Sequence, residues 1–161
     1  MIAAINGAAM GGGFEIALAC DIRVISESAT IGLPEIRFGA LPAGGGTQRL
    51  PRLVGTGIAK EMIFSGLPWT AAEALRAGMV NRVAPAAELM NVCAEIAGVY
   101  IERAAYALKT AKTLVNRSAE LSLEDGIAGA QDDLGNGHAG GETKSAGTSS
   151  SDSTDVRPHF R

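Results

Sequence analysis

The 161-residue sequence predicts an α/β fold, in which short buried strands alternate with helices. Residues 1–6 form a mostly apolar run that stops at Gly7, which is typical of a buried strand in a parallel sheet. Apolar residues make up 47% of the chain, enough for a substantial core, whereas aromatic residues make up only 4%. A core built mainly from Ala, Val, Ile and Leu favours helices packed closely on a sheet.

The same alternation continues along the chain. Alternating or β-rich runs predict further strands over residues 21–26, 30–32 and 79–83. Glycines and prolines indicate a loop over 33–46. The helical patterns cover residues 14–20, 47–54, 57–65, 70–78, 86–103 and 104–117, with a further helix opening at Glu124. The Thr-x-x-Glu sequence at 70–73 has the form of a capping box and fixes where its helix begins.

Composition divides the chain into three regions. We predict an α/β core over 1–85, a helical region over 86–130 and an aberrant or disordered tail over 131–161. Residues 135–155 are nearly all small or polar, so they cannot bury enough surface to offset the entropy of ordering. Both histidines, His138 and His159, lie in or beyond this stretch, and we therefore expect no catalytic histidine.

Charge and cysteine content exclude several classes of protein. The formal net charge is −3 and no stretch clusters Lys or Arg, so nucleic acid is not an expected partner. No apolar run approaches the length of about 18 residues that a membrane span requires. Cys20 and Cys93 have no metal-site spacing and sit among apolar neighbours, which predicts two buried, reduced thiols. A reducing compartment is expected, namely the cytoplasm, or the mitochondrial matrix in a eukaryote.

The first segment that could perform chemistry is the glycine triplet at 11–13, followed by Phe14 and Glu15. Glycines let the backbone approach a ligand closely, and the start of a helix points unpaired N–H groups and a positive dipole end at it. An N–H group there could stabilise an oxyanion that develops on a carbonyl. The spacing of a phosphate-binding loop is absent. The alternative is a tight strand-to-helix turn without further function.

The second is a pair of acids, Glu15 and Glu35, each among apolar neighbours. Burying a carboxylate is costly unless it is paired or protonated, and two such acids can divide general acid and base roles around one substrate. The alternative is that each glutamate caps a helix or pairs with an arginine such as Arg23 or Arg37.

The third is a glycine loop at 41–50, which reads Leu-Pro-Ala-Gly-Gly-Gly-Thr-Gln-Arg-Leu. We interpret its second half, 45–49, as a structural turn that places the loop carrying Glu35.

In this order and spacing the three segments resemble the enoyl-CoA hydratase/isomerase (crotonase) family. The resemblance rests on Gly-Gly-Gly-Phe-Glu at 11–15, Pro-Glu-Ile at 34–36 and Gly-Gly-Thr-Gln-Arg-Leu at 45–50, and it covers about residues 1–130. It implies the crotonase (ClpP/crotonase) spiral fold, present in part and followed by C-terminal helices. No metal or cofactor is implied, because coenzyme A is part of the acyl-CoA substrate. A homotrimer or a hexamer is the implied assembly.

The resemblance also implies roles for individual residues. Gly12 matches the glycine that donates an oxyanion-hole N–H to the thioester oxygen. Glu15 and Glu35 match the two glutamates that hold the catalytic water and move its protons. Pro34 and Ala43 match substrate-site positions, with Ala43 standing where the family usually has a glycine that donates its N–H to the water.

Hydration of a 2-enoyl-CoA is therefore the expected reaction, since both acids are present. Isomerisation and thioester hydrolysis within the same superfamily are the alternatives, as is an inactive, truncated subunit. The family has a further stretch upstream that supplies the other oxyanion donor and most of the CoA surface. Because this chain begins inside a core strand, we expect it to be a fragment with little hydratase activity. The family pattern is lost after residue 131 and returns at 157–161, which suggests a local reading-frame disturbance.

Overall fold

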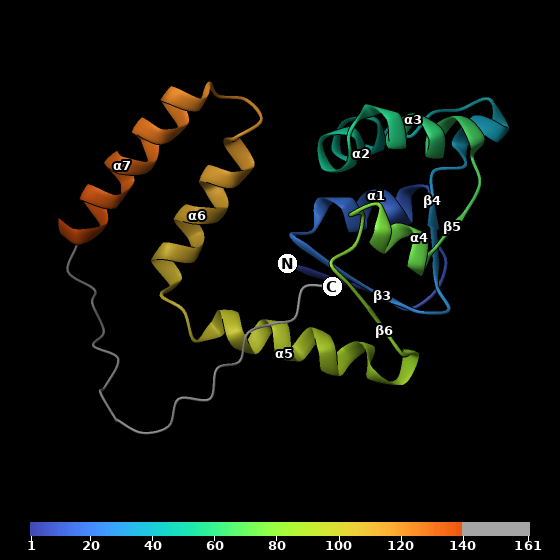
Figure 1. Ribbon diagram of the computed structural model, residues 1–161, viewed down its shortest axis with the longest axis horizontal. Coiled ribbons are helices and arrows are strands. Elements are labelled where there is room, and N and C mark those ends of the chain that lie inside the picture. The colour runs from blue at the N-terminus through green and yellow to red at the C-terminus, as the bar shows by residue number, and fades with distance from the viewer. Residues whose placement is uncertain (140–161) are drawn as a thin grey trace.

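The computed structural model describes residues 1–139 and shows an α/β architecture (Figure 1). Its main sheet has the strand order β1-β3-β6, from β1 (Ile2–Ile5), β3 (Ile22–Ser26) and β6 (Arg82–Ala84). Both pairings are parallel, with Ile5 opposite Ile25 in the first. The expected parallel sheet is therefore confirmed.

Helices cover the two faces of this sheet. Because successive side chains of a strand point to opposite faces, neighbouring residues of β3 enter different cores. Ile25 packs with buried residues of α1 (Gly12–Ala19), whereas Val24 packs with buried residues of α5 (Leu89–Ile101). Figure 1 shows α1 and α5 on opposite sides of β3 and β6. The result is a helix–sheet–helix sandwich, with α1 held firmly on one face.

A second, smaller sheet lies beside α1 and matters most for the site. It consists of β2 (Ala9–Met10), β4 (Thr30–Gly32) and β5 (Trp69–Thr70), in the order β2-β4-β5. β2 and β4 run parallel with Met10 opposite Gly32, and β5 runs antiparallel to β4. The chain therefore leaves β2 and β4 at the same edge of the sheet.

Three further helices lie on the same side of the main sheet as α1 (Figure 1). They are α2 (Gly46–Val54), α3 (Thr56–Ser65) and α4 (Ala71–Arg76), and α2 packs between α1 and α3. In Figure 1, α4 lies beside α1, and α2 and α3 lie beyond it. The predicted capping box at the start of α4 is present. Thr70 Oγ1 accepts a hydrogen bond from the N–H of Glu73, and the Glu73 carboxylate accepts one from the N–H of Thr70.

The last two helices, α6 (Ala105–Arg117) and α7 (Leu123–Ala139), form a pair that stands apart from the layers in Figure 1. α7 continues through residues 135–139, so the prediction of disorder was wrong for these five positions. Adding residues to an existing helix costs less free energy than starting one, and the helix therefore extends into the polar stretch. Residues 140–155, the rest of that prediction, lie outside the described residues. No helix in the described range combines the length and apolar character needed to cross a membrane.

Other elements differ from the sequence-based expectation in their boundaries. The strand expected at 79–83 is shorter and later, because Met79 belongs to the turn that ends α4 and donates its N–H to Ala74 O at 2.9 Å. A short 3-10 helix, η1 (Glu35–Phe38), interrupts the loop expected over 33–46. Met79 is fully buried but belongs to no strand. Its apolar side chain packs in the core, and the sequence pattern alone could not distinguish this from a strand.

Candidate active site

The candidate site is built where β2 and β4 end. The chain that leaves β2 enters Gly11, and the chain that leaves β4 reaches Pro34 and Glu35. The N–H of Gly11 donates to Gly32 O at 2.8 Å and joins the two exits. In open α/β sheets ligands bind at the carboxyl ends of strands, so this edge is where the fold favours a ligand.

Gly11 brings the two exits into contact. Its φ of 56° lies in the left-handed region that favours glycine. A Cβ at this position would lie 2.9 Å from Oε1 of Glu35, which shows how closely that carboxylate approaches the turn. Conformation and close approach both require glycine here, and the Glu35 side chain therefore lies beside the start of α1.

Gly12 occupies the first position of α1 and is exposed. A Cβ added at Gly12 or Gly13 would meet no heavy atom within 4 Å. The first N–H groups of a helix have no carbonyl partner within the helix and carry the positive end of its dipole. The N–H of Gly12, at the exposed first position of α1, is therefore a candidate donor to an electron-rich oxygen, and it directly follows Gly11, the residue that Glu35 approaches.

Glu15 lies one turn further along α1 and is only 7% exposed. Its Oε1 accepts a hydrogen bond from the N–H of Gly46 at 2.8 Å, at the start of α2. A Cβ at Gly44 would come within 2.5 Å of its other oxygen, Oε2. The glycine turn before α2 thus contacts Glu15 directly. Gly46 also lies against Leu33 and Pro42, and the expectation that residues 45–49 position the loop of Glu35 stays a prediction.

Glu35 begins η1, directly after the half-buried Pro34. Its Oε2 is buried and has no hydrogen-bond partner among the described residues. A buried polar atom left without a partner costs about 1–3 kcal/mol, and a donor such as a water or a substrate hydroxyl would remove that cost. Ala43 is exposed in the turn that precedes α2, two residues after Leu41.

The structure bears on the structural alternatives for the two acids, ion pairing and helix capping, while their acid/base role stays a prediction. Neither forms an ion pair within residues 1–139, so pairing with Arg23 or Arg37 was wrong. The guanidinium of Arg23 binds main-chain carbonyls, and the stem of Arg37 packs against the backbone of Gly66. Capping describes Glu15, which accepts the first N–H of α2. Sequence reasoning missed this contact because its partners are 31 residues apart.

A cavity of about 1090 Å³ lies elsewhere, at the far end of α1. Its lining includes several cations, but most already have partners. Lys112 pairs with Asp21 at 2.8 Å. Arg49 donates to Gly44 O and Arg52 to Gln48 O, both at 2.9 Å. Cations that already have hydrogen-bond or ion-pair partners are poorly suited to bind an anionic ligand. We therefore take the glycine turn, and not this cavity, as the candidate active site.

The cysteines are both free, but only Cys93 is buried, whereas Cys20 is half-buried. The prediction of two buried thiols therefore holds for one of them. Burial raises the pKa of the Cys93 thiol, which disfavours the nucleophilic thiolate. Within residues 1–139 no cluster of three or more His, Cys, Asp or Glu side chains could hold a metal ion.

The sequence and the fold both match known proteins. The family model described as enoyl-CoA hydratase/isomerase matches residues 1–148, further than the resemblance over 1–130 had extended. A short-chain-enoyl-CoA hydratase of Clostridium acetobutylicum is 48% identical over 128 residues, covering 80% of this chain and 49% of that protein. An enoyl-CoA isomerase/hydratase of Mycosarcoma maydis is 41% identical over 127 residues, with 78% and 46% coverage.

Among solved structures, an enoyl-CoA hydratase subunit of Geobacillus kaustophilus superimposes with a TM-score of 0.84 at 40% identity, covering 86% of this chain and 54% of that one. This agreement confirms the expected crotonase-type fold. The chain spans about half the length of the relatives it matches. Family match, identity and fold agree, and the chain belongs to the enoyl-CoA hydratase/isomerase family.

Proposed function

We propose that this chain carries the acid/base apparatus of an enoyl-CoA hydratase, which adds water to the 2,3-double bond of a 2-enoyl-CoA thioester. Glu15 and Glu35 handle the protons of the reaction. The N–H of Gly12 binds the thioester oxygen. The names of the relatives support this reaction class, and the geometry at the start of α1 supports the assignment of residues.

The chemistry follows from what hydration requires. The oxygen of water forms a bond to C3 while one carboxylate accepts a proton from that water. The electron pair of the double bond moves toward the thioester carbonyl and gives an enolate, which is then protonated at C2. Two acid/base groups suit these two proton movements, and placing them beside the reacting atoms contributes typically 10²–10⁴-fold to the rate.

The N–H of Gly12 suits the negative charge that develops on the thioester oxygen. It lies at the positive end of α1, and the enolate oxygen gains charge as water adds. One such donor typically contributes about 3 kcal/mol to stabilising the transition state.

One observation carries the proposal. Gly11 is in contact with the Glu35 carboxylate, and its O accepts the N–H of Glu15 at 2.9 Å. The Glu35 carboxylate therefore lies beside the residue that precedes α1, and the main chain of Glu15 closes the first turn of that helix. The buried Oε2 of Glu35, which lacks a partner in the described part of the chain, offers a position for the proton of a water molecule.

The experiment is a chimera in which this chain replaces the matched half of the Clostridium acetobutylicum hydratase. We expect it to hydrate crotonyl-CoA, followed by the loss of absorbance of the conjugated thioester, and we expect the 161-residue chain alone to show little turnover. Glu15→Gln and Glu35→Gln should each lower kcat by at least about 100-fold. Exposed Glu61, far along the chain on α3, gives the matched control Glu61→Gln, with unchanged turnover. Full activity in both active-site variants would refute the assignment.

The same chimera distinguishes the alternative of double-bond isomerisation. An isomerase needs one acid to move a proton between two carbons, whereas hydration needs two groups. If a 3-enoyl-CoA is isomerised in the Glu15→Gln variant while hydration is lost, Glu35 alone is the proton shuttle of a secondary activity. Hydration that survives without Glu15 would instead count against the two-acid mechanism.

The assembly and compartment follow the same proposal. We infer an acyl-CoA substrate, no cofactor beyond the coenzyme A of that substrate, and a homotrimer or hexamer for the complete protein. The cytoplasm, or the mitochondrial matrix in a eukaryote, supplies such substrates and keeps Cys20 and Cys93 reduced.

A further inference from the structure

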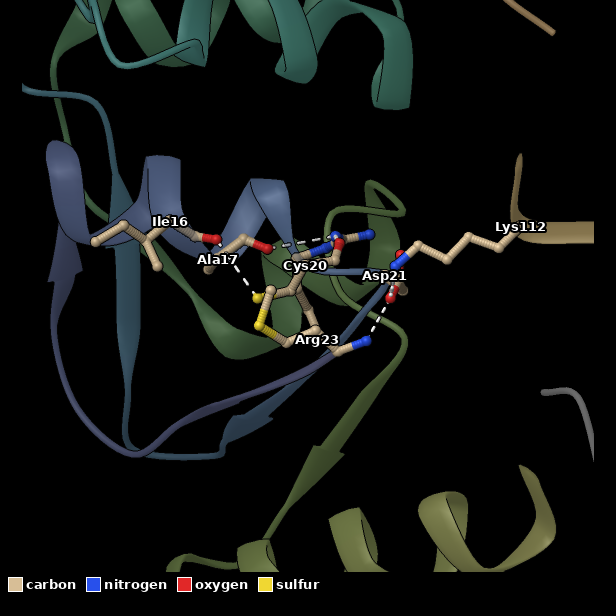
Figure 2. A network of polar contacts seen from close by, with 7 residues as sticks. Ile16, Ala17, Cys20, Asp21, Arg23 and Lys112 are labelled. Atoms are coloured by element: carbon tan, nitrogen blue, oxygen red, sulfur yellow. Dashed lines mark hydrogen bonds and ion pairs between the residues drawn. The ribbon is translucent and has the colours of Figure 1, made fainter. Parts of the chain in front are cut away.

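Arg23, on β3, is an almost fully buried cation that forms no salt bridge with a carboxylate among the residues that the structure describes. It is 6% exposed, and within residues 1–139 its guanidinium donates to main-chain carbonyls; Figure 2 shows it beside Ala17 and Cys20. Nε donates to Met79 O at 2.7 Å, while Nη1 donates to Cys20 O at 2.8 Å and to Ala17 O at 3.4 Å. Burial lowers the pKa of the guanidinium, which nevertheless remains charged. The hydrogen bonds to these carbonyls offset part of the free-energy cost of removing the charge from water.

Two of the carbonyls that Arg23 binds belong to the end of α1. The last carbonyls of a helix have no N–H partner within the helix, and they form the negative end of its dipole. Ala17 O already accepts the N–H of Cys20 at 3.1 Å, and Arg23 adds a second, longer bond to it, while Cys20 O receives the shorter bond from Arg23. The cation thus lies at the negative end of the dipole, where α1 has no basic residue of its own in its last turn. Arg23 therefore serves as the C-terminal cap of this helix.

The main chain of Arg23 is fixed as firmly as its side chain. Its N–H donates to Oδ1 of Asn81 at 2.8 Å, and the N–H of Asn81 donates back to Arg23 O at 2.8 Å. Together with the bond to Met79 O, these contacts tie β3 to the segment that leads into β6. The end of α1 is thereby anchored to two strands of the main sheet.

The other end of α1 carries the groups of the proposed reaction. The helix has eight residues, so it is roughly 12 Å long and moves as one rigid body. Near its start, α1 is linked to α2 by the hydrogen bond from the N–H of Gly46 to the carboxylate of Glu15. A change in tilt at the Arg23 end would displace Gly12 and Glu15 from Glu35, and sub-ångström displacements of such groups are enough to slow catalysis.

We propose that Arg23 is a positioning residue: by anchoring the end of α1 to the main sheet, it sets where Gly12 N–H and the Glu15 carboxylate stand relative to Glu35. The catalytic consequence of this positioning rests on the proposed function. The effect of Arg23 on the placement of α1 is independent of it and can be measured in the 161-residue chain.

The test compares Arg23→Met and Arg23→Lys by amide hydrogen exchange. Arg23→Met removes the cation and keeps an apolar stem. We expect the Gly46 amide, which is held by Glu15, to exchange about tenfold faster relative to the Cys93 amide on α5. Arg23→Lys keeps the charge but loses the planar fork of donors, so an intermediate change of about threefold is expected. If Arg23→Met does not fold, the lysine variant alone decides.

Two control variants separate positioning from general loss of stability. Ile96→Ala removes buried carbon atoms on the α5 face of the sheet. It should increase the exchange rate of the Cys93 amide at least as much as that of the Gly46 amide. Arg76→Met removes an exposed arginine and should change neither. If Gly46 and Cys93 accelerate equally in the Arg23 variants, or neither responds, Arg23 does not position α1 and the proposal is overturned.

Activity in the chimera distinguishes the two proposals. Arg23→Lys should lower kcat about tenfold with KM changed by less than about threefold, because misplaced groups weaken the transition state more than the bound substrate. An unchanged kcat overturns the positioning role in the reaction. A parent chimera that does not hydrate crotonyl-CoA refutes the proposed function, while a selective response of Gly46 in the chain still establishes the anchoring of α1.

Discussion

Single glycines decide how the carboxylates of this site are placed. At Gly11, a side chain would collide with Glu35, and at Gly44 a side chain would collide with Glu15. At Gly12 a side chain would meet open space. Gly11 and Gly44 therefore let the main chain lie close to the two carboxylates, whereas Gly12 leaves room for a ligand at the start of α1.

Gly12→Pro tests the donor role of the N–H. Proline suits the first position of a helix, so α1 should persist, but the variant has no N–H to offer the thioester oxygen. We expect kcat in the chimera to fall by about 10²–10³-fold, the typical cost of losing an oxyanion donor. Gly12→Ala, which keeps the N–H, is the matched control for adding bulk, and circular dichroism checks that both variants fold. Equal activity of the proline and alanine variants would exclude the donor role.

Gly44→Ala tests the placement of Glu15. The added methyl would lie 2.5 Å from Oε2, so the carboxylate must move and its bond to Gly46 N–H is strained. We expect a loss of about 1–3 kcal/mol in unfolding free energy, measured by urea titration, together with a lower kcat. Gly57→Ala, at an open position of α3, should instead leave both unchanged or be slightly stabilising. Wild-type stability in Gly44→Ala would contradict the contact.

At this scale the sequence predicted the identity of the acids but not their partners. Glu15 and Glu35 stood out because carboxylates among apolar neighbours are costly. The partner of Glu15 is a main-chain N–H, which no residue type encodes, 31 positions away. Arg23 was one of two alternative ion-pair partners for the acids, but in the structure its guanidinium binds main-chain carbonyls, including Cys20 O at 2.8 Å.

Among the elements, strand pairing and helix capping position the site. The parallel register of β2 and β4 brings two chain exits together, and α1 is attached at both ends. Local patterns predicted most helices because periodicity and caps are local properties. The smaller sheet was not predicted as a unit, since strands of two or three residues carry almost no pattern, and their pairing depends on distant segments.

α6 joins the body of the molecule through the exposed pair between Lys112 Nζ and Asp21, at 2.8 Å. Burial alone would raise the pKa of Asp21, but its bonds to Lys112 and to the amino group of Met1 outweigh burial, and its pKa lies below the usual value. A carboxyl whose pKa is lowered on folding contributes stability above its unfolded pKa of about 4. That contribution is lost as the pH falls through the lower, folded pKa.

We therefore expect α6 to loosen as the pH falls below about 4, the unfolded pKa, measured as faster amide exchange in α6 relative to α5. The pair is exposed, so it is worth at most about 1 kcal/mol. Lys112→Met should remove most of this pH dependence, while Lys109→Met, three residues away on the same helix, should leave it intact. The same acid response in wild type and Lys112→Met would contradict the role of the pair.

The whole molecule carries surface that its own described residues do not cover. β1 pairs with a strand on one side only, and α6 and α7 hold exposed apolar side chains such as Val115 at 70% and Leu123 at 82%. Open edges and large apolar patches favour association.

The fold class was predictable because alternating strands and helices with few aromatic residues leave few other architectures. The position of α6 and α7 was not, because their sequences specify helices but not where the helices pack. One contact of α6 with the core joins two charged residues 91 positions apart, Lys112 and Asp21, and only the folded chain brings them together.

The most direct measurement is a crystal structure of the chimera with a bound, unreactive acyl-CoA analogue. The account predicts the thioester oxygen at about 3 Å from the N of Gly12, with C2 and C3 between the carboxylates of Glu15 and Glu35. An acyl thioester bound away from α1, with both carboxylates remote from its carbons, would contradict it.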